Sequence, residues 1–124
     1  MRDKSRTLTE QELEIMKVVW ELKTATVRDV YETLLRRRKI AYTTVMTMMN
    51  ILEEKGHLKK RAAEKAYVYR PAQAKAKVVQ AMVKDFVQRV FNGSAQPLLV
   101  QLVKDRQLSE KDLDEISRQI KEAK

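Results

Sequence analysis

Basic residues gather in one stretch of the chain and are its first candidates for chemistry. Residues 36–70 hold 10 Lys or Arg against 3 Asp or Glu, a net charge of +7 within a chain of net +9. As a group they favour neutralisation of nucleic-acid phosphates, although any one of them could instead be a solubilising side chain. The predicted phosphate and wing contacts are Arg36, Arg37, Arg38, Lys39, Lys59, Lys60, Arg61, Lys65 and Tyr67.

A lightly charged segment, residues 41–52, lies between the basic run at 36–39 and the basic residues of 59–70. Apolar residues recur in it at i, i+3, i+4 and i+7, which predicts a helix with one face in a core. These are Val45, Met48, Met49 and Leu52. The remaining outer faces and the helix start carry Tyr42, Thr43, Thr44, Met46, Thr47 and Asn50. In a chain with 35% charged residues, a face meant for water would usually carry Lys and Glu, so this face favours contact with DNA bases over a solvated surface.

The base-reading face has a chemistry of its own. It holds no Arg or Lys, so the bidentate contact of arginine with guanine is not available from it. Threonine methyl groups and Met46 suit the methyl group of thymine, and Asn50 suits adenine. The face therefore predicts a preference for sites that contain A·T pairs.

Enzymatic and metal sites are not predicted. The chain has no cysteine and one histidine, His57, which excludes thiolate chemistry and a histidine-rich metal centre. It has no Gly-rich phosphate loop and no nucleophile with a matching base. Trp20, Phe86 and Phe91 have the spacing of packing residues. We expect no catalysis, no cofactor and no metal.

The elements that position these residues are mostly helical. Only two Gly and two Pro occur in 124 residues, which is scarce for a β-rich protein. Capping boxes at Thr9/Glu12, Thr26/Asp29 and Ser109/Asp112 predict helix starts, and Ser94 is expected to cap another. A hairpin is predicted with strands at 58–62 and 66–70 and its tip at 63–65.

This order predicts a mainly α fold with a small β-wing. Residues 1–71 form a winged helix-turn-helix DNA-binding domain, in which the third helix enters the major groove and the hairpin lies along the backbone. Residues 72–124 form a helical dimerisation domain, because so small a unit would otherwise expose its apolar faces. Its predicted contacts are Val79, Met82, Val83, Phe86, Val90, Phe91, Leu98, Leu99, Leu102, Val103, Leu113, Ile116 and Ile120.

The predicted partners are a double-stranded DNA operator and a second copy of the chain. A polar start and the lack of a long apolar run predict a cytoplasmic protein without a membrane partner. The alternative is a winged-helix module that binds a protein and not DNA. A membrane-surface protein is a third class, but it needs a basic amphipathic helix, and here the basic residues flank helices.

Several runs resemble the BlaI/MecI family of penicillinase and methicillin-resistance repressors. The most specific are AYTTVMTMMNILEEKGHLKKR at 41–61 and AYVYRP at 66–71, supported by LTEQELEIMKVVW at 8–20, TVRDVYETL at 26–34, FNGS at 91–94 and LSEKDLDEI at 108–116. The resemblance implies a dimeric winged-helix repressor on a two-fold symmetric operator with TACA/TGTA-like halves. It also implies that bases meet residues among Tyr42, Thr43, Thr44, Met46 and Thr47.

The resemblance bears on induction as well. Antibiotic-responsive members of the family are cleaved by an inducer protease at an Asn-Phe bond in the dimerisation unit. The matching bond here joins Gln101 to Leu102, and because both residues differ from the family's, cleavage there is not favoured. A related branch senses copper through C-terminal cysteines, which this chain lacks.

Overall fold

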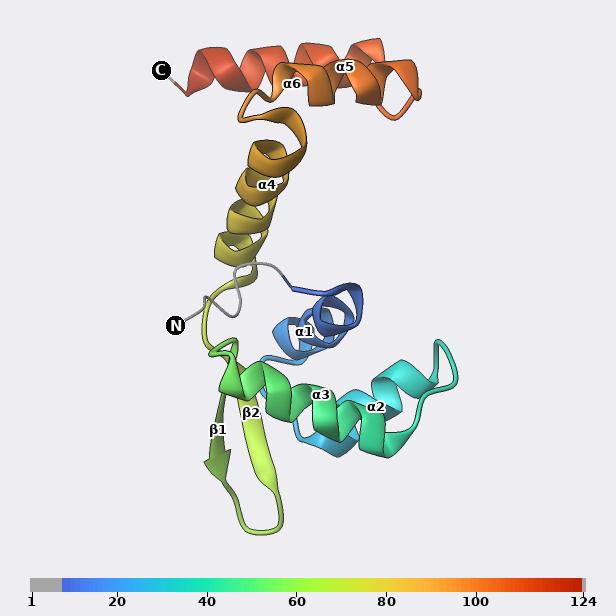
Figure 1. The fold of residues 1–124 in the computed structure, drawn as a ribbon, viewed down its shortest axis with the longest axis vertical. Coiled ribbons are helices and arrows are strands. Elements are labelled where there is room, and N and C mark those ends of the chain that lie inside the picture. Colours follow the sequence, from blue (N-terminus) through green and yellow to red (C-terminus); the bar gives the residue numbers. More distant parts are fainter. Residues whose placement is uncertain (1–7, 124) are drawn as a thin grey trace. The chain divides into compact units, whose positions relative to one another are not determined.

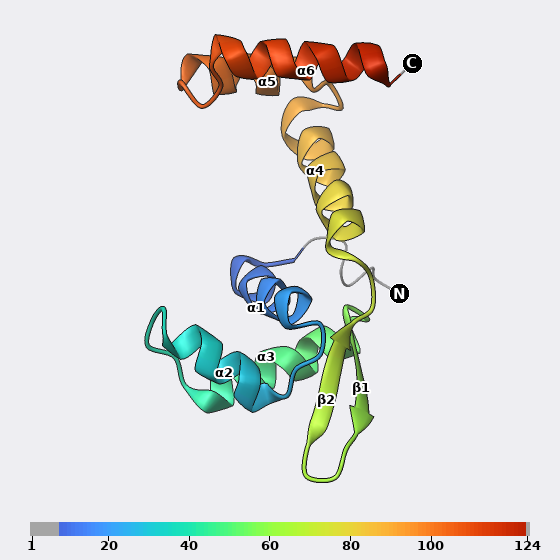
Figure 2. The ribbon, with the colours of Figure 1, turned by 180° about the vertical axis from the view of Figure 1, so that it is seen from behind.

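Six helices and one hairpin make up the described part of the chain, as predicted. The structure is a computed structural model that describes residues 8–123 (Figures 1 and 2). The elements in chain order are α1 (Glu10–Leu22), α2 (Val27–Leu35), α3 (Tyr42–Glu54), β1 (Leu58–Ala62), β2 (Tyr67–Pro71), α4 (Lys75–Phe91), α5 (Gln96–Lys104) and α6 (Glu110–Glu122). The mainly α fold with a small β-wing is confirmed.

The chain divides into two compact units inside α4, the first ending at Val83 and the second beginning at Lys84. The first unit continues past residue 71 because the start of α4 packs on it, with Val78 buried and Met82 against the core. The indole of Trp20 also donates a hydrogen bond to the carbonyl of Gln73, at 3.0 Å. The assignment of 1–71 to DNA binding and 72–124 to dimerisation stays a prediction.

The first unit has a hydrophobic core that fixes the inner face of α3. Val45, Met49 and Leu52 are completely buried, and Met48 packs on the core from its edge. All four were predicted to face inward. The remaining core comes from α1, α2, the hairpin and the start of α4: Leu8, Ile15, Met16, Val18, Val19, Ala25, Val30, Leu34, Leu58, Tyr69 and Val78.

Helix starts follow the predicted capping boxes. At Thr9, Thr26 and Ser109 the hydroxyl accepts the N–H of the third helical residue, whose carboxylate in turn accepts the N–H of the cap. The cap predicted at Ser94 is wrong. α5 begins at Gln96 with Ala95 as its N-cap and Pro97 in its first turn, so Ser94 lies one residue too early to cap it.

The hairpin is antiparallel and pairs Leu58 with Pro71 at one end and Ala62 with Tyr67 at the other. Its second strand begins at Tyr67, one residue later than predicted, because the N–H of Ala63 donates to the carbonyl of Ala66 and closes the turn there. A bridge from Tyr69 to Ala25 joins the hairpin to the segment before α2.

A partly buried ion pair joins the start of α1 to the end of α3. The Glu12 side chain is 5% exposed, and its Oε2 accepts a hydrogen bond from Lys55 Nζ at 2.7 Å while Oε1 accepts the N–H of Thr9. Burial alone would raise the pKa of Glu12. The bonds from Lys55 and Thr9, with the charge of Lys55, outweigh burial, so the pKa of Glu12 lies below its ordinary value of 4.5.

Replacement of Glu12 by glutamine is expected to lower the free energy of unfolding by about 2 kcal/mol at pH 7. A carboxyl group whose folded pKa is depressed stabilises the fold above its ordinary pKa, and this stabilisation is lost as the pH falls through the folded pKa. The difference between parent and Glu12→Gln should therefore narrow below pH 4.5. Urea unfolding of both proteins at several pH values measures this difference in the free energy of unfolding.

The matched control for this prediction is Asp29→Asn. Asp29 occupies the same position in the capping box of α2, but it is exposed, and the described bond of its carboxylate is to the N–H of Thr26. We expect Asp29→Asn to lower the free energy of unfolding at pH 7 by less than Glu12→Gln does. Equal losses from the two variants would show that the ion pair with Lys55 adds nothing to the capping box.

In the second unit, none of the described residues 84–123 is buried. Its most accessible apolar side chains include Ile120 at 60%, Val90 at 51% and Phe86 at 42% exposure. Phe91, Leu98, Leu102, Leu113 and Ile116 are half-buried within the unit, and the rings of Phe86 and Phe91 meet edge to face. Exposed apolar area of this extent is typical of a surface that another chain covers.

A helix that crosses a membrane must be both long and apolar. None of those in residues 8–123 is both long and apolar enough to cross a bilayer.

Candidate nucleic-acid interface

A groove of about 590 Å³ lies between the start of α2, the outer face of α3 and the hairpin. It brings together parts of the chain that are up to 43 residues apart. Its lining residues are Thr26, Val27, Arg28, Tyr42, Met46, Asn50, Lys60, Lys65, Ala66, Tyr67 and Tyr69. The groove lining thus combines three cationic side chains with aromatic, apolar and uncharged polar groups.

The residues predicted to read bases lie on the outer side of α3. Tyr42, Thr43, Thr44, Met46, Thr47 and Asn50 are all exposed. Three of them, Tyr42, Met46 and Asn50, also line the groove. The face therefore combines accessibility with an uncharged surface, which suits contact with base edges in a major groove.

Tyr42 is held in place from two sides at the start of α3. The ring of Tyr31 meets it edge to face at 5.4 Å between ring centroids. The guanidinium of Arg28 lies over the Tyr42 ring, 5.6 Å from its centroid. These contacts restrict the Tyr42 ring and keep a positive charge in the groove next to α3.

Arg28 was missed by the sequence interpretation. It lies outside the basic stretch of 36–70 and pairs with Glu32 one helical turn later, at 3.5 Å, as many surface arginines do. Only the packing of α2 against α3 places it beside Tyr42. The helical spacing within 27–35 shows that Arg28 is on the polar side, but it does not show which element it faces.

The hairpin supplies the other cations of the groove. Lys60 lies over the ring of Tyr67, with Nζ 4.5 Å from the centroid. Tyr67 is 51% exposed, so its ring is accessible to a ligand. Lys59, Arg61 and Lys65 are exposed as well.

Tyr69 lies on the same strand as Tyr67 but is buried, whereas Tyr67 is exposed. Tyr69 is 2% exposed, and its hydroxyl donates a hydrogen bond to Oδ1 of Asn50 at 3.1 Å. A tyrosine hydroxyl is protonated at neutral pH, and burial raises the pKa of Tyr69 further above its ordinary value of 10.0. Of the two tyrosines, the one that packs the hairpin on the body is therefore Tyr69.

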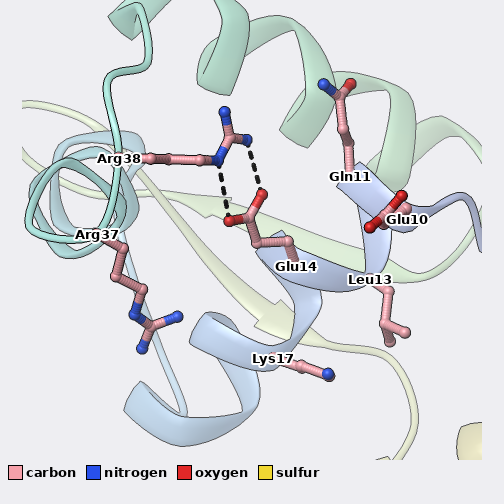
Figure 3. Close-up of a pocket in the computed structure, with 7 residues that line it drawn as sticks. All are labelled: Glu10, Gln11, Leu13, Glu14, Lys17, Arg37 and Arg38. Atoms are coloured by element: carbon pink, nitrogen blue, oxygen red, sulfur yellow. Dashed lines mark hydrogen bonds and ion pairs between the residues drawn. The ribbon is translucent and has the colours of Figure 1, made fainter.

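The basic run at 36–39 lies elsewhere. Arg37 and Arg38 line a second hollow, of about 560 Å³, together with residues of α1 (Figure 3). Arg38 makes two hydrogen bonds to Glu14, at 2.7 and 3.1 Å, and these hold the pKa of Glu14 below its ordinary value. Figure 3 shows Arg37 turned away from Glu14. All four residues 36–39 are exposed, but none lines the groove beside α3.

The described residues hold no group of three or more acidic, histidine or cysteine side chains that could bind a metal ion. The groove offers cations, aromatic rings, amide and hydroxyl groups, and no carboxylate lines it. Groups of these kinds suit contacts with phosphates and base edges.

Comparison with known proteins gives a consistent result. The model of the penicillinase repressor family matches residues 8–122. The penicillinase repressor of Bacillus licheniformis is 25% identical over 117 residues, which are 94% of this chain and 91% of that protein.

Two solved structures share the fold of the first unit. The DNA-binding domain of the repressor BlaI has a TM-score of 0.54 and 27% identity, and covers 60% of this chain and 92% of its own. The Bacillus licheniformis BlaI monomer in complex with the blaP half-operator has a TM-score of 0.50 and 27% identity, and covers 56% of this chain and 85% of its own.

Proposed function

Because the chain belongs to the penicillinase repressor family, we propose that it is a dimeric transcriptional repressor that occupies a palindromic operator with TACA/TGTA-like halves. Two copies of the base-reading face, one from each chain, meet two half-sites related by the same two-fold axis. The repressor blocks transcription by occupying the DNA and has no catalytic activity. It acts where the chromosome is, which places it in the cytoplasm.

The observation that carries this proposal is the composition of the groove and of the α3 face. Arg28 from α2 and Lys60 and Lys65 from the hairpin supply cations on either side of an exposed helix face without charge. Cations on the flanks neutralise phosphates, and the uncharged face contacts base edges. If this surface bound an acidic protein instead, we would expect Lys and Arg on the α3 face as well as on its flanks.

Dimerisation is supported by the second unit. Its described residues have no buried core, and exposed apolar side chains lie on each of its helices. A second copy is the partner that two-fold DNA requires. Linkage of two DNA-binding units makes the second half-site contact intramolecular, which raises affinity without any new contact.

Release from DNA is proposed to follow loss of the dimer. The bond between Gln101 and Leu102 lies inside α5, and Gln101 donates side-chain hydrogen bonds to Asp105 one turn later. A protease that binds extended chain would have to unwind α5 before it could cut there. Unfolding of the second unit is therefore the common step in release by cleavage or by an inducing signal.

Selection of DNA from a random pool tests the proposal. The purified protein, at near-physiological salt, is expected to enrich a palindrome whose halves are TACA-like. Enrichment of no shared sequence, with binding that only falls as salt rises, would instead favour an architectural role or the protein-interaction module.

The salt dependence of operator binding is expected to distinguish the roles of Arg28 and Arg38. Arg28 lines the groove, so Arg28→Gln should reduce the slope of log affinity against log salt by about 2, since a dimer loses two phosphate contacts of about 0.9 each. Arg38→Gln removes the same charge, but Arg38 does not line the groove and is held by two hydrogen bonds to Glu14 on α1. The slope should change little. Anisotropy titrations of the selected operator between 50 and 200 mM salt measure the slopes of both variants. Equal slopes would contradict the proposal that Arg28, and not Arg38, contacts phosphates.

A further inference from the structure

Tyr69 is fixed at the junction of the hairpin and the base-reading helix. Its N–H donates to the carbonyl of Ala25 at 2.8 Å, and its own carbonyl accepts the N–H of Ala25 at 2.9 Å. Its side chain is almost fully buried. The backbone of β2 is therefore fixed to the segment before α2, and the Tyr69 hydroxyl is held at one place beside α3.

From that place the hydroxyl reaches Asn50, which is exposed on the outer face of α3 and lines the groove. The hydroxyl donates to the amide oxygen Oδ1 at 3.1 Å. An asparagine side chain has an acceptor end, Oδ1, and a donor end, Nδ2 with two N–H groups. With Oδ1 turned toward Tyr69, the donor end is left for a ligand.

We propose that Tyr69 is a positioning residue that makes Asn50 a donor-only contact and so excludes cytosine from one position of each half-site. The inference rests on the proposed function, because it assumes that the outer face of α3 meets base edges. It goes further by assigning the direction of one hydrogen bond and the residue that sets it.

The major-groove edges of the four bases explain why cytosine is the excluded one. Guanine offers N7 and O6 as acceptors, adenine offers N7 and thymine offers O4, while cytosine offers only the donor N4–H₂. Two donors facing each other leave both N–H groups without an acceptor, and such groups are costly once water is displaced. The two-ended pairing of asparagine with adenine needs a free Oδ1, so Tyr69 also weakens the preference for adenine that the sequence predicts.

The first test is Tyr69→Phe, which removes the hydroxyl and keeps the ring. The amide of Asn50 can then turn and offer Oδ1 to cytosine. From the selected operator, the affinity for the cytosine variant at each position is compared with that for the parent base. We expect the penalty for cytosine at one position per half-site to fall by about five-fold, the worth of one neutral hydrogen bond. An unchanged penalty at every position would overturn the proposal.

The second test is Asn50→Asp, which does not depend on Tyr69→Phe remaining fully folded. Aspartate keeps an acceptor for the Tyr69 hydroxyl and replaces the outward N–H groups by an oxygen. The base preference at the same position should then invert toward cytosine, even though the added charge weakens binding overall. Retention of the parent's preference by Asn50→Asp would also overturn the proposal.

The matched control is Tyr31→Phe. It makes the same chemical change in the same unit at a partly buried tyrosine whose ring meets Tyr42 and not Asn50. It should leave the cytosine penalty as in the parent. If the parent itself enriches no operator, the proposed function fails and this inference with it. If the parent enriches one and Tyr69→Phe and Tyr31→Phe behave alike, only this inference fails.

Discussion

Thr47→Glu is expected to abolish specific operator binding while leaving the dimer intact. Thr47 is exposed in the middle of α3, so glutamate can be accommodated without disturbing the core. In the complex, however, its carboxylate is brought against base edges and phosphates, and like-charge contacts of this kind cost several kcal/mol. With one such contact in each half-site, we expect a loss of at least about 10³-fold, or about 4 kcal/mol.

Anisotropy with the selected operator at about 0.15 M salt measures this loss, and sedimentation measures the dimer. The control is Gln11→Glu, which adds the same charge at an exposed position of α1, beside Arg37 and Arg38 and away from the groove. It should bind within a few-fold of the parent. If Thr47→Glu also binds as the parent does, the assignment of the base-reading face to this side of α3 is wrong.

Val90→Asp is expected to convert the protein to a monomer. Val90 lies near the end of α4 and is 51% exposed within one chain. In a two-fold dimer whose interface covers it, the change buries two unpaired carboxylates, each costing several kcal/mol. The monomer then binds each half-site separately, and affinity for the full operator should fall by about 10²–10⁴-fold, while affinity for a single half-site is retained.

Gln88→Asp tests whether the effect belongs to one face of α4. Gln88 is exposed and lies about 160° around the helix from Val90, on the polar side. Sedimentation should report about twice the 14.5 kDa chain mass for Gln88→Asp and the chain mass for Val90→Asp. A dimeric Val90→Asp would mean that a different surface joins the two copies.

Local patterns predicted much of the fold. The spacing of Val45, Met48, Met49 and Leu52 settled which side of α3 faces the core, and with it which side is exposed. The three capping boxes predicted the starts of three helices because both hydrogen bonds of such a box join residues three apart. The weakest local signal was at α5, where the serine at 94 resembled a cap and the proline at 97 marked the true start.

The composition of the groove could not be predicted in the same way. Arg28 and Tyr42 are 14 residues apart, Arg38 and Glu14 are 24 apart, and Tyr69 and Asn50 are 19 apart. Helical and strand periods say which side of an element is polar, but they do not say which polar side chain meets which. The density of charge at 36–39 therefore gave no sign that none of these four residues lines the groove, and the single arginine on α2 that does line it was missed.

The absence of buried residues from the described part of the second unit bears on how operator binding depends on the amount of protein. In the dimer proposed above, the C-terminal part gains its core from a second copy, so the folding equilibrium would depend on the concentration of the chain. At low abundance, single chains are both weak DNA binders and easy substrates for degradation. For the proposed repressor, we then expect occupancy of the operator to rise more steeply than in proportion to the number of chains made, so that modest changes in synthesis or turnover change transcription sharply.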